Sequence, residues 1–155
     1  MTTWPPSRQV TAAGPGTAAL VPLYRRVSDD LVRIIEQCLQ AWRPWLRTGE
    51  EVILTALPLY HIFAFTANLM LFFVTGGRDI LVPSPRPLSN LKTVMETEPV
   101  TWFTGVNTLF AGLMHEAWFL QKPSWTFRGT VAGGMALVPA VGERWEQVTK
   151  TPIYQ

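Results

Sequence analysis

The chain has 155 residues, of which 48% are hydrophobic and only 15% are charged, and its formal net charge is +2. This length allows one domain at most, or part of a larger one, and the weak charge without a Lys/Arg block argues against a nucleic-acid-binding surface. The single cysteine, Cys38, excludes a disulfide framework. The two histidines, His61 and His115, are far apart and have no carboxylate at ligand spacing, so no structural metal site is predicted.

The first 27 residues show no sustained hydrophobic period. They contain turn-forming segments such as Gly14-Pro15-Gly16, so residues 1–27 are expected to form an irregular leader. A helix is predicted to begin at Ser28, a good N-cap residue, and to end at Pro44. The structured part is therefore expected to be residues 28–155.

Beyond Pro44, short apolar segments alternate with segments of helical period. The predicted strands are Val52–Leu57, Asp79–Val82, Val100–Thr104, Phe127–Ala132 and a segment beginning near Pro152. The predicted helices are Ile62–Val74 and three others, which carry Leu91 to Met95, Leu109 to Ala117, and Val141 to Val148. This repeated strand–helix–strand order predicts an α/β fold, a partial parallel sheet with helices on both faces that is still incomplete at Gln155.

The segment from Val52 to Gly77 contains no Asp, Glu, Lys or Arg. It is long enough to span a bilayer, but His61 and Asn68 interrupt it, and its continuous apolar part after His61 has only about 13 residues. We therefore expect Ile62–Val74 to be a helix that is buried on all sides. The low share of charged residues leaves one alternative open, a small non-catalytic membrane-associated or lipid-binding protein.

Polar residues and glycines follow three of the predicted strands. The carboxyl ends of parallel strands meet at one edge of a sheet, so the loops Pro58–Ile62, Gly105–Thr108 and Gly133–Leu137 are expected to line one crevice. They offer an imidazole, a phenol, an amide, a hydroxyl and exposed backbone N–H groups beside apolar side chains, which suits a ligand with an acidic head and an apolar tail. Taken singly, His61 could be a core histidine bonded to a backbone carbonyl, and Gly133-Gly134 an ordinary turn.

Four short motifs carry a resemblance to a known family. They are TALPLYHIFA at residues 55–64, TGVNTLF at 104–110, AGGM at 132–135 and ERW at 143–145. In this order and spacing they resemble bacterial long-chain fatty-acid–CoA ligases of the AMP-forming acyl-adenylate synthetase superfamily, and the likeness runs from Ile35 to Gln155. The resemblance implies that the chain is a central fragment of the N-terminal adenylation domain of such a ligase.

The resemblance implies a two-step reaction. A long-chain fatty acid and ATP form acyl-adenylate and diphosphate with Mg²⁺, and CoA then takes the acyl group as a thioester. The implied location is the cytoplasm, with peripheral contact to the inner face of the membrane. His61 would be the catalytic residue, beside the substrate carboxylate and the α-phosphate. The other implied contacts are the gate residue Phe65, the substrate-binding residues Tyr60, Val106, Thr108 and Met135, and the nucleotide-binding residues Gly133 and Gly134.

The chain departs from the family pattern at both ends. A phosphate loop ending in Lys-Gly would precede the helix of Ile35, but this region reads GPGTAAL at residues 14–20, and no lysine occurs before Lys92. The family's Tyr-Gly-x-Thr-Glu motif, whose Glu helps hold Mg²⁺, would begin after Gln155. Adenylyl transfer depends on the positioning of the substrates and on neutralisation of the phosphate charge, and both the Lys-Gly loop and the Mg²⁺-holding motif are missing from this sequence. We therefore expect the fragment to be inactive alone. A ligase of the same superfamily for another carboxylic acid is the remaining alternative.

Overall fold

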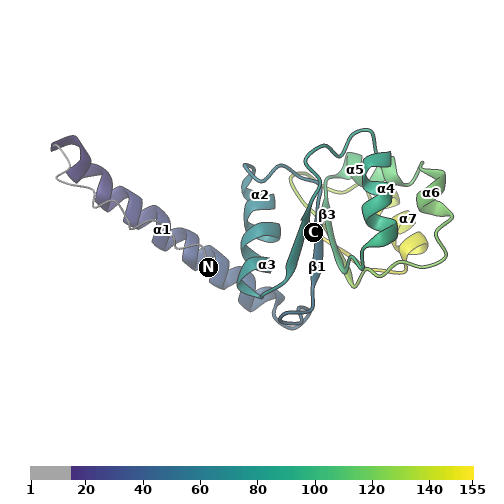
Figure 1. The fold of residues 1–155 in the computed structure, drawn as a ribbon, viewed down its shortest axis with the longest axis horizontal. Coiled ribbons are helices and arrows are strands. Elements are labelled where there is room, and N and C mark those ends of the chain that lie inside the picture. Colours follow the sequence, from purple (N-terminus) through teal and green to yellow (C-terminus); the bar gives the residue numbers. More distant parts are fainter. Residues whose placement is uncertain (1–14) are drawn as a thin grey trace, which may run out of the picture.

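A five-stranded parallel sheet forms the centre of the protein (Figure 1). The computed structural model describes residues 15–155, with side chains from Arg26 onward. The strands are β1 (Val52–Thr55), β2 (Arg78–Leu81), β3 (Trp102–Gly105), β4 (Gly129–Ala132) and β5 (Ile153–Tyr154). Their order across the sheet is β2-β1-β3-β4-β5, and every neighbouring pair is parallel. The predicted α/β fold with a parallel sheet is confirmed.

Helices cover both faces of this sheet. They are α1 (Pro15–Trp42), α2 (Ile62–Ala64), the π-helical segment η1 (Phe65–Met70), α3 (Leu71–Val74), α4 (Ser89–Thr97), α5 (Asn107–Leu113), α6 (Ala117–Leu120) and α7 (Pro139–Thr149). The continuous helix α2–η1–α3 and the last turns of α1 lie on one face, while α4 to α7 lie on the other (Figure 1). The first part of α1 extends away from the sheet.

Helix α1 begins at Pro15, earlier than the predicted start at Ser28. Proline suits the first turn of a helix, because the N–H that it lacks would have no intrahelical partner there. Pro22 lies inside the helix, where proline usually ends one, and this is why the sequence pattern pointed to irregular chain. The structure thus differs from the predicted leader over residues 15–27, and residues 1–14 lie outside the described part.

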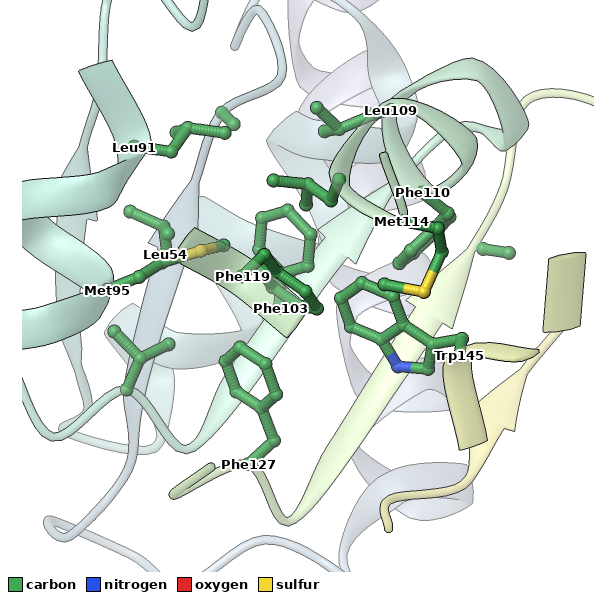
Figure 2. Close-up of a cluster of buried hydrophobic side chains, with 14 of the residues drawn as sticks. Leu54, Leu91, Met95, Phe103, Leu109, Phe110, Met114, Phe119, Phe127 and Trp145 are labelled. Carbon is green, nitrogen blue, oxygen red and sulfur yellow. The ribbon is translucent and has the colours of Figure 1, made fainter. Parts of the chain in front are cut away.

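The two faces of the sheet hold separate cores, because successive strand residues point to opposite sides. On one side, Leu54 of β1 and Phe103 of β3 pack with buried side chains from all four helices, Leu91, Met95, Leu109, Phe110, Phe119 and Trp145 (Figure 2). On the other side, Ile53 and Trp102 pack against Leu71 and Phe72 of α3 and against the end of α1. Burial on both faces explains why these strands are continuous apolar runs.

The helix from Ile62 to Val74 is buried on one side only. Ala64, Asn68 and Leu71 are almost fully buried, whereas Phe73 is 75% exposed and Ile62 is 61% exposed. The prediction that this helix is buried on all sides is therefore wrong, because its outer side faces solvent in the described part of the chain. No helix within residues 15–155 is long and apolar enough to cross a membrane.

Candidate functional site

Three loops leave the sheet at one edge, as predicted. The parallel register brings the carboxyl ends of β1, β3 and β4 together, so the loops that follow Thr55, Gly105 and Ala132 are neighbours. The connection after β1 enters the helix on one face, while those after β2 and β3 enter helices on the opposite face. In open parallel sheets, ligands bind where successive connections pass to opposite faces in this way.

His61 is the N-cap residue of the helix that follows β1. Its Nδ1 accepts a hydrogen bond from the backbone N–H of Phe63 at 3.2 Å, and the residue is exposed. His61 is therefore not a core histidine. Because Nδ1 acts as an acceptor, the neutral imidazole carries its proton on Nε2 and can donate a hydrogen bond from that atom.

The predicted substrate contacts differ in their exposure. Tyr60 is 93% exposed and Met135 is 60% exposed, and Thr108 is exposed as well. Phe65, the first residue of the π-helical segment, and Val106 are half-buried. The structure therefore does not bring these five residues together as the walls of one enclosed pocket.

Glycine is favoured at positions 133 and 134 for different reasons. A Cβ atom on Gly133 would lie 2.6 Å from Cζ of Phe63, and the Gly133 N–H donates to the carbonyl oxygen of Gly105 at 3.1 Å. Gly134 is exposed and has a φ of +80°, a conformation that favours glycine. Packing against Phe63 thus accounts for Gly133, whereas Gly134 leaves an open stretch of backbone beside Val106.

The loops at this edge carry few charged groups. Residues 58–62, 105–108 and 133–137 include no Lys or Arg, so a cation that would neutralise a polyphosphate is not among them. Within residues 15–155, no group of three or more His, Cys, Asp or Glu side chains could hold a metal ion. The donor set described here does not fit the Mg²⁺ site that the family resemblance implies.

Sequence reasoning missed a pocket of about 370 Å³ on the other side of β1. It opens between the carboxyl ends of β1 and β2, and none of the predicted site residues lines it. The lining consists of Thr55, Ala56, Leu57, Pro58, Leu59, Leu81, Val82, Pro83 and Pro85. The signal available in the sequence was the group of prolines, which fix the backbone and make rigid walls.

Sequence reasoning also missed a buried polar cluster beneath the loops. Asn68 is fully buried, and its Nδ2 donates to the hydroxyl oxygens of Thr55 and Thr104, both at 2.8 Å. Thr55 donates in turn to Oδ1 of Asp79 at 2.6 Å. Burial raises the pKa of the Asp79 carboxyl, and the hydrogen bond from Thr55 opposes that rise. The only sequence signal was an asparagine inside an uncharged helix.

Comparison with known proteins identifies the family. Residues 29–155, well over half of the chain, match the model of the AMP-binding enzyme family. The chain belongs to this family. The matched range contains every predicted site residue from Tyr60 to Met135.

Curated relatives of this AMP-binding enzyme chain include long-chain-fatty-acid–CoA ligases. The ligase of Yersinia pestis is 43% identical over 115 residues, which cover 74% of this chain and 20% of the relative. The ligase of Escherichia coli O157:H7 is 37% identical over 141 residues, which cover 91% of this chain and 25% of the relative. The chain thus spans a fifth to a quarter of the length of these relatives.

A solved structure shares the fold of this AMP-binding enzyme chain. ATP-bound MatB from Rhodopseudomonas palustris superposes with a TM-score of 0.69 at 21% sequence identity, and the match covers 82% of this chain and 25% of MatB. The parallel sheet and its flanking helices therefore correspond to one part of a larger fold.

Proposed function

We propose that this chain is part of a long-chain fatty-acid–CoA ligase. The observation that carries the proposal is the 43% identity to the Yersinia pestis ligase over 74% of the chain. The exposed histidine at the carboxyl edge of the sheet and the apolar side chains beside it support the same assignment.

In the proposed reaction, a carboxylate oxygen of the fatty acid attacks the α-phosphorus of ATP. The bond from this phosphorus to the oxygen that bridges it to the β-phosphate breaks, and diphosphate leaves. The sulfur of CoA then attacks the acyl carbon, the thiol proton is released, and AMP leaves with the anhydride oxygen. The products are acyl-CoA, AMP and diphosphate.

His61 is the residue proposed to act on the reacting groups. It stands at the exposed carboxyl end of β1, and its capping hydrogen bond uses Nδ1, so Nε2 supplies the donor. A donor at this position would orient the fatty-acid carboxylate and stabilise the negative charge that develops during transfer.

The alkyl chain of the substrate would lie on apolar side chains next to His61. Met135 and Ile62 are well exposed, and Phe65 and Val106 are half-buried. Tyr60 and Thr108 would complete the substrate contacts. Each CH₂ group that leaves water contributes about 0.8 kcal/mol, so such a surface favours long acids over short ones.

The nucleotide would approach the backbone at Gly133 and Gly134. Gly134 suits this role better, because the N–H of Gly133 already donates to Gly105. The presence of ATP in the structure of MatB supports a nucleotide position in this fold. The ligands of Mg²⁺, the cations for the phosphates and the CoA site would come from other parts of the ligase, because residues 15–155 hold no metal-binding cluster. We therefore expect no catalysis by this chain alone.

Isothermal titration of the purified chain with carboxylic acids tests the proposal. We expect laurate, myristate and palmitate to bind with affinities that rise with chain length, and benzoate not to bind. ATP-dependent exchange of labelled diphosphate should be absent from the same sample. Preference for benzoate would instead favour an adenylate-forming ligase for another carboxylic acid, and binding of neither class refutes the fatty-acid site.

The same titration separates a ligase fragment from a lipid-binding protein. If His61 contacts the carboxylate of the fatty acid, His61→Asn should weaken palmitate binding. Palmitate binding that is unchanged in His61→Asn would favour the alternative of a non-catalytic lipid-binding protein.

A further inference from the structure

The backbone pairing between β1 and β3 ends before the strands do. The pairing of β1 with β2 continues to Thr55, and that of β3 with β4 continues to Gly105. Between β1 and β3, in contrast, the last pair is Leu54 with Phe103. The backbone pairing of β1 with β3 therefore stops before Thr55 and Thr104, close to the loops that carry the candidate site.

The side chain of Asn68 bridges the strands at this point. It comes from the π-helical segment η1 and is 0% exposed. Its Nδ2 donates to Thr55 and Thr104 at 2.8 Å each, and the Thr104 hydroxyl donates back to Oδ1 at 2.9 Å. Side-chain hydrogen bonds thus join the two strands where their backbone pairing ends.

Two observations argue that this arrangement does more than fill the core. π-Helical turns are rare and are frequently found at functional sites, and this one supplies the buried amide. The network also extends to a third strand, because Thr55 donates to Asp79 of β2 at 2.6 Å. A leucine would fill the same space, but it would leave the threonine hydroxyls without their partner.

We propose that Asn68 is a positioning residue that holds the carboxyl ends of β1 and β3 at a fixed separation. The loop to His61 begins after Thr55, and the loop with Val106 follows Gly105, the residue after Thr104, so this separation sets the distance between the two loops. Asn68 acts through the two threonines and does not touch the ligand. Binding of a fatty-acid head between these loops rests on the proposed function, whereas the bracing of the loops by Asn68 does not.

Paired substitutions of Thr104 separate hydrogen bonding from packing. Thr104→Val replaces the hydroxyl with a methyl group of similar volume, and Thr104→Ser keeps the hydroxyl. Amide hydrogen exchange of the 155-residue chain would be followed by mass spectrometry in residues 56–61 and 105–108, with β4 as the internal reference. We expect Thr104→Val to raise exchange about tenfold in both loops and to leave β4 within about twofold, and Thr104→Ser to stay within about twofold throughout.

A uniform rise over the whole sheet, or equal effects of valine and serine, would overturn the proposal. If Thr104→Val does not fold, Thr55→Val is the second test. It removes the hydrogen bond between Asn68 and Thr55 and keeps the one between Asn68 and Thr104, and Thr55→Ser is its control. We expect a smaller rise there, about threefold, in the same two loops.

Palmitate titration of the same variants tests the link to the ligand. We expect about tenfold weaker binding by Thr104→Val and at most about twofold weaker binding by Thr104→Ser. Loosened loops with unchanged palmitate affinity would refute the positioning role. If the wild-type chain binds no fatty acid, the proposed function fails, while the exchange measurement still decides whether Asn68 holds the loops.

Discussion

The ring of Phe63 occupies the space in which a side chain at Gly133 would stand. A Cβ atom on Gly133 would lie 2.6 Å from Cζ of this ring and 2.8 Å from its Cε1 and Cε2 atoms. Phe63 belongs to the helix that follows β1, and Gly133 follows β4. This contact therefore holds the helix that His61 caps against the loop that contains Gly133. The sequence pattern predicted both segments at the same site.

Gly133→Ala should destabilise the protein through this contact. The added methyl group has to displace the Phe63 ring from a packed position, and overpacking of this kind costs about 1–3 kcal/mol. Urea unfolding followed by tryptophan fluorescence measures the loss. The double variant Phe63→Ala/Gly133→Ala should lose less than the sum of the two single variants, because the ring that the new methyl would strike is gone. Strict additivity would show that the two residues do not interact.

His61 combines a capping role with its proposed chemical role, and two substitutions separate them. Asparagine is a good N-cap residue, so His61→Asn should change the free energy of unfolding by less than about 0.5 kcal/mol, while His61→Ala should cost about 1 kcal/mol. Both variants lose the Nε2 donor, so both should bind palmitate more weakly. Equal stability of the two variants would contradict the capping role, and full palmitate affinity in His61→Asn would contradict the substrate contact.

The Asp79 carboxyl should make stability depend on pH. Burial raises its pKa in the folded protein above the ordinary value of 3.8. Between the unfolded-state and folded-state pKa values of Asp79, the folded protein holds more protons than the unfolded chain. The contribution of Asp79 to stability is therefore most favourable below pH 3.8 and is lost as the pH rises through the folded-state pKa. Asp79→Asn keeps an oxygen for the Thr55 hydroxyl but does not ionise.

We therefore expect Asp79→Asn to be more stable than the wild type at neutral pH. The difference should shrink as the pH is lowered toward 4, because the wild-type carboxyl then becomes neutral as well. Urea unfolding at a series of pH values measures both curves. A difference that grows toward acidic pH would mean that the Asp79 carboxylate is stabilised by its surroundings rather than destabilised by burial.

The exposed apolar side chains of Ile62, Phe73 and Val74 predict peripheral contact with a membrane. Phe73 is 75% exposed, and burial of a whole phenylalanine side chain contributes about 1.5–3 kcal/mol. Phe73→Ser should therefore weaken binding to anionic phospholipid vesicles by about tenfold or more. Leu120→Ser, on α6 at the opposite face, is the matched control and should bind like the wild type.

Alkaline extraction decides between surface contact and insertion. A peripheral chain should be released from cell membranes by sodium carbonate at high pH. Retention in the membrane pellet would contradict peripheral contact and favour the alternative of a membrane-embedded protein.

The strands were predictable because each is a short apolar run bounded by proline, glycine or polar residues. β1 and β4 lie within their predicted ranges, Val52–Leu57 and Phe127–Ala132, and β3 overlaps Val100–Thr104. Helix ends were less predictable. Helix α1 starts at Pro15 and includes Pro22, although a proline inside a helical pattern usually marks a helix end. The predicted helix with Leu109 and Ala117 is divided into α5 and α6.

By itself, the sequence determined the α/β alternation, the parallel sheet and the shared edge of the His61 and Gly133 loops. These features follow from local hydrophobic period and from the direction of the strands. Only the tertiary structure decided that Phe63 lies over Gly133 and that Asn68 joins Thr55 to the neighbouring strand. Such contacts join residues far apart in the chain, and their geometry depends on how the helix packs on the sheet, which no local pattern specifies.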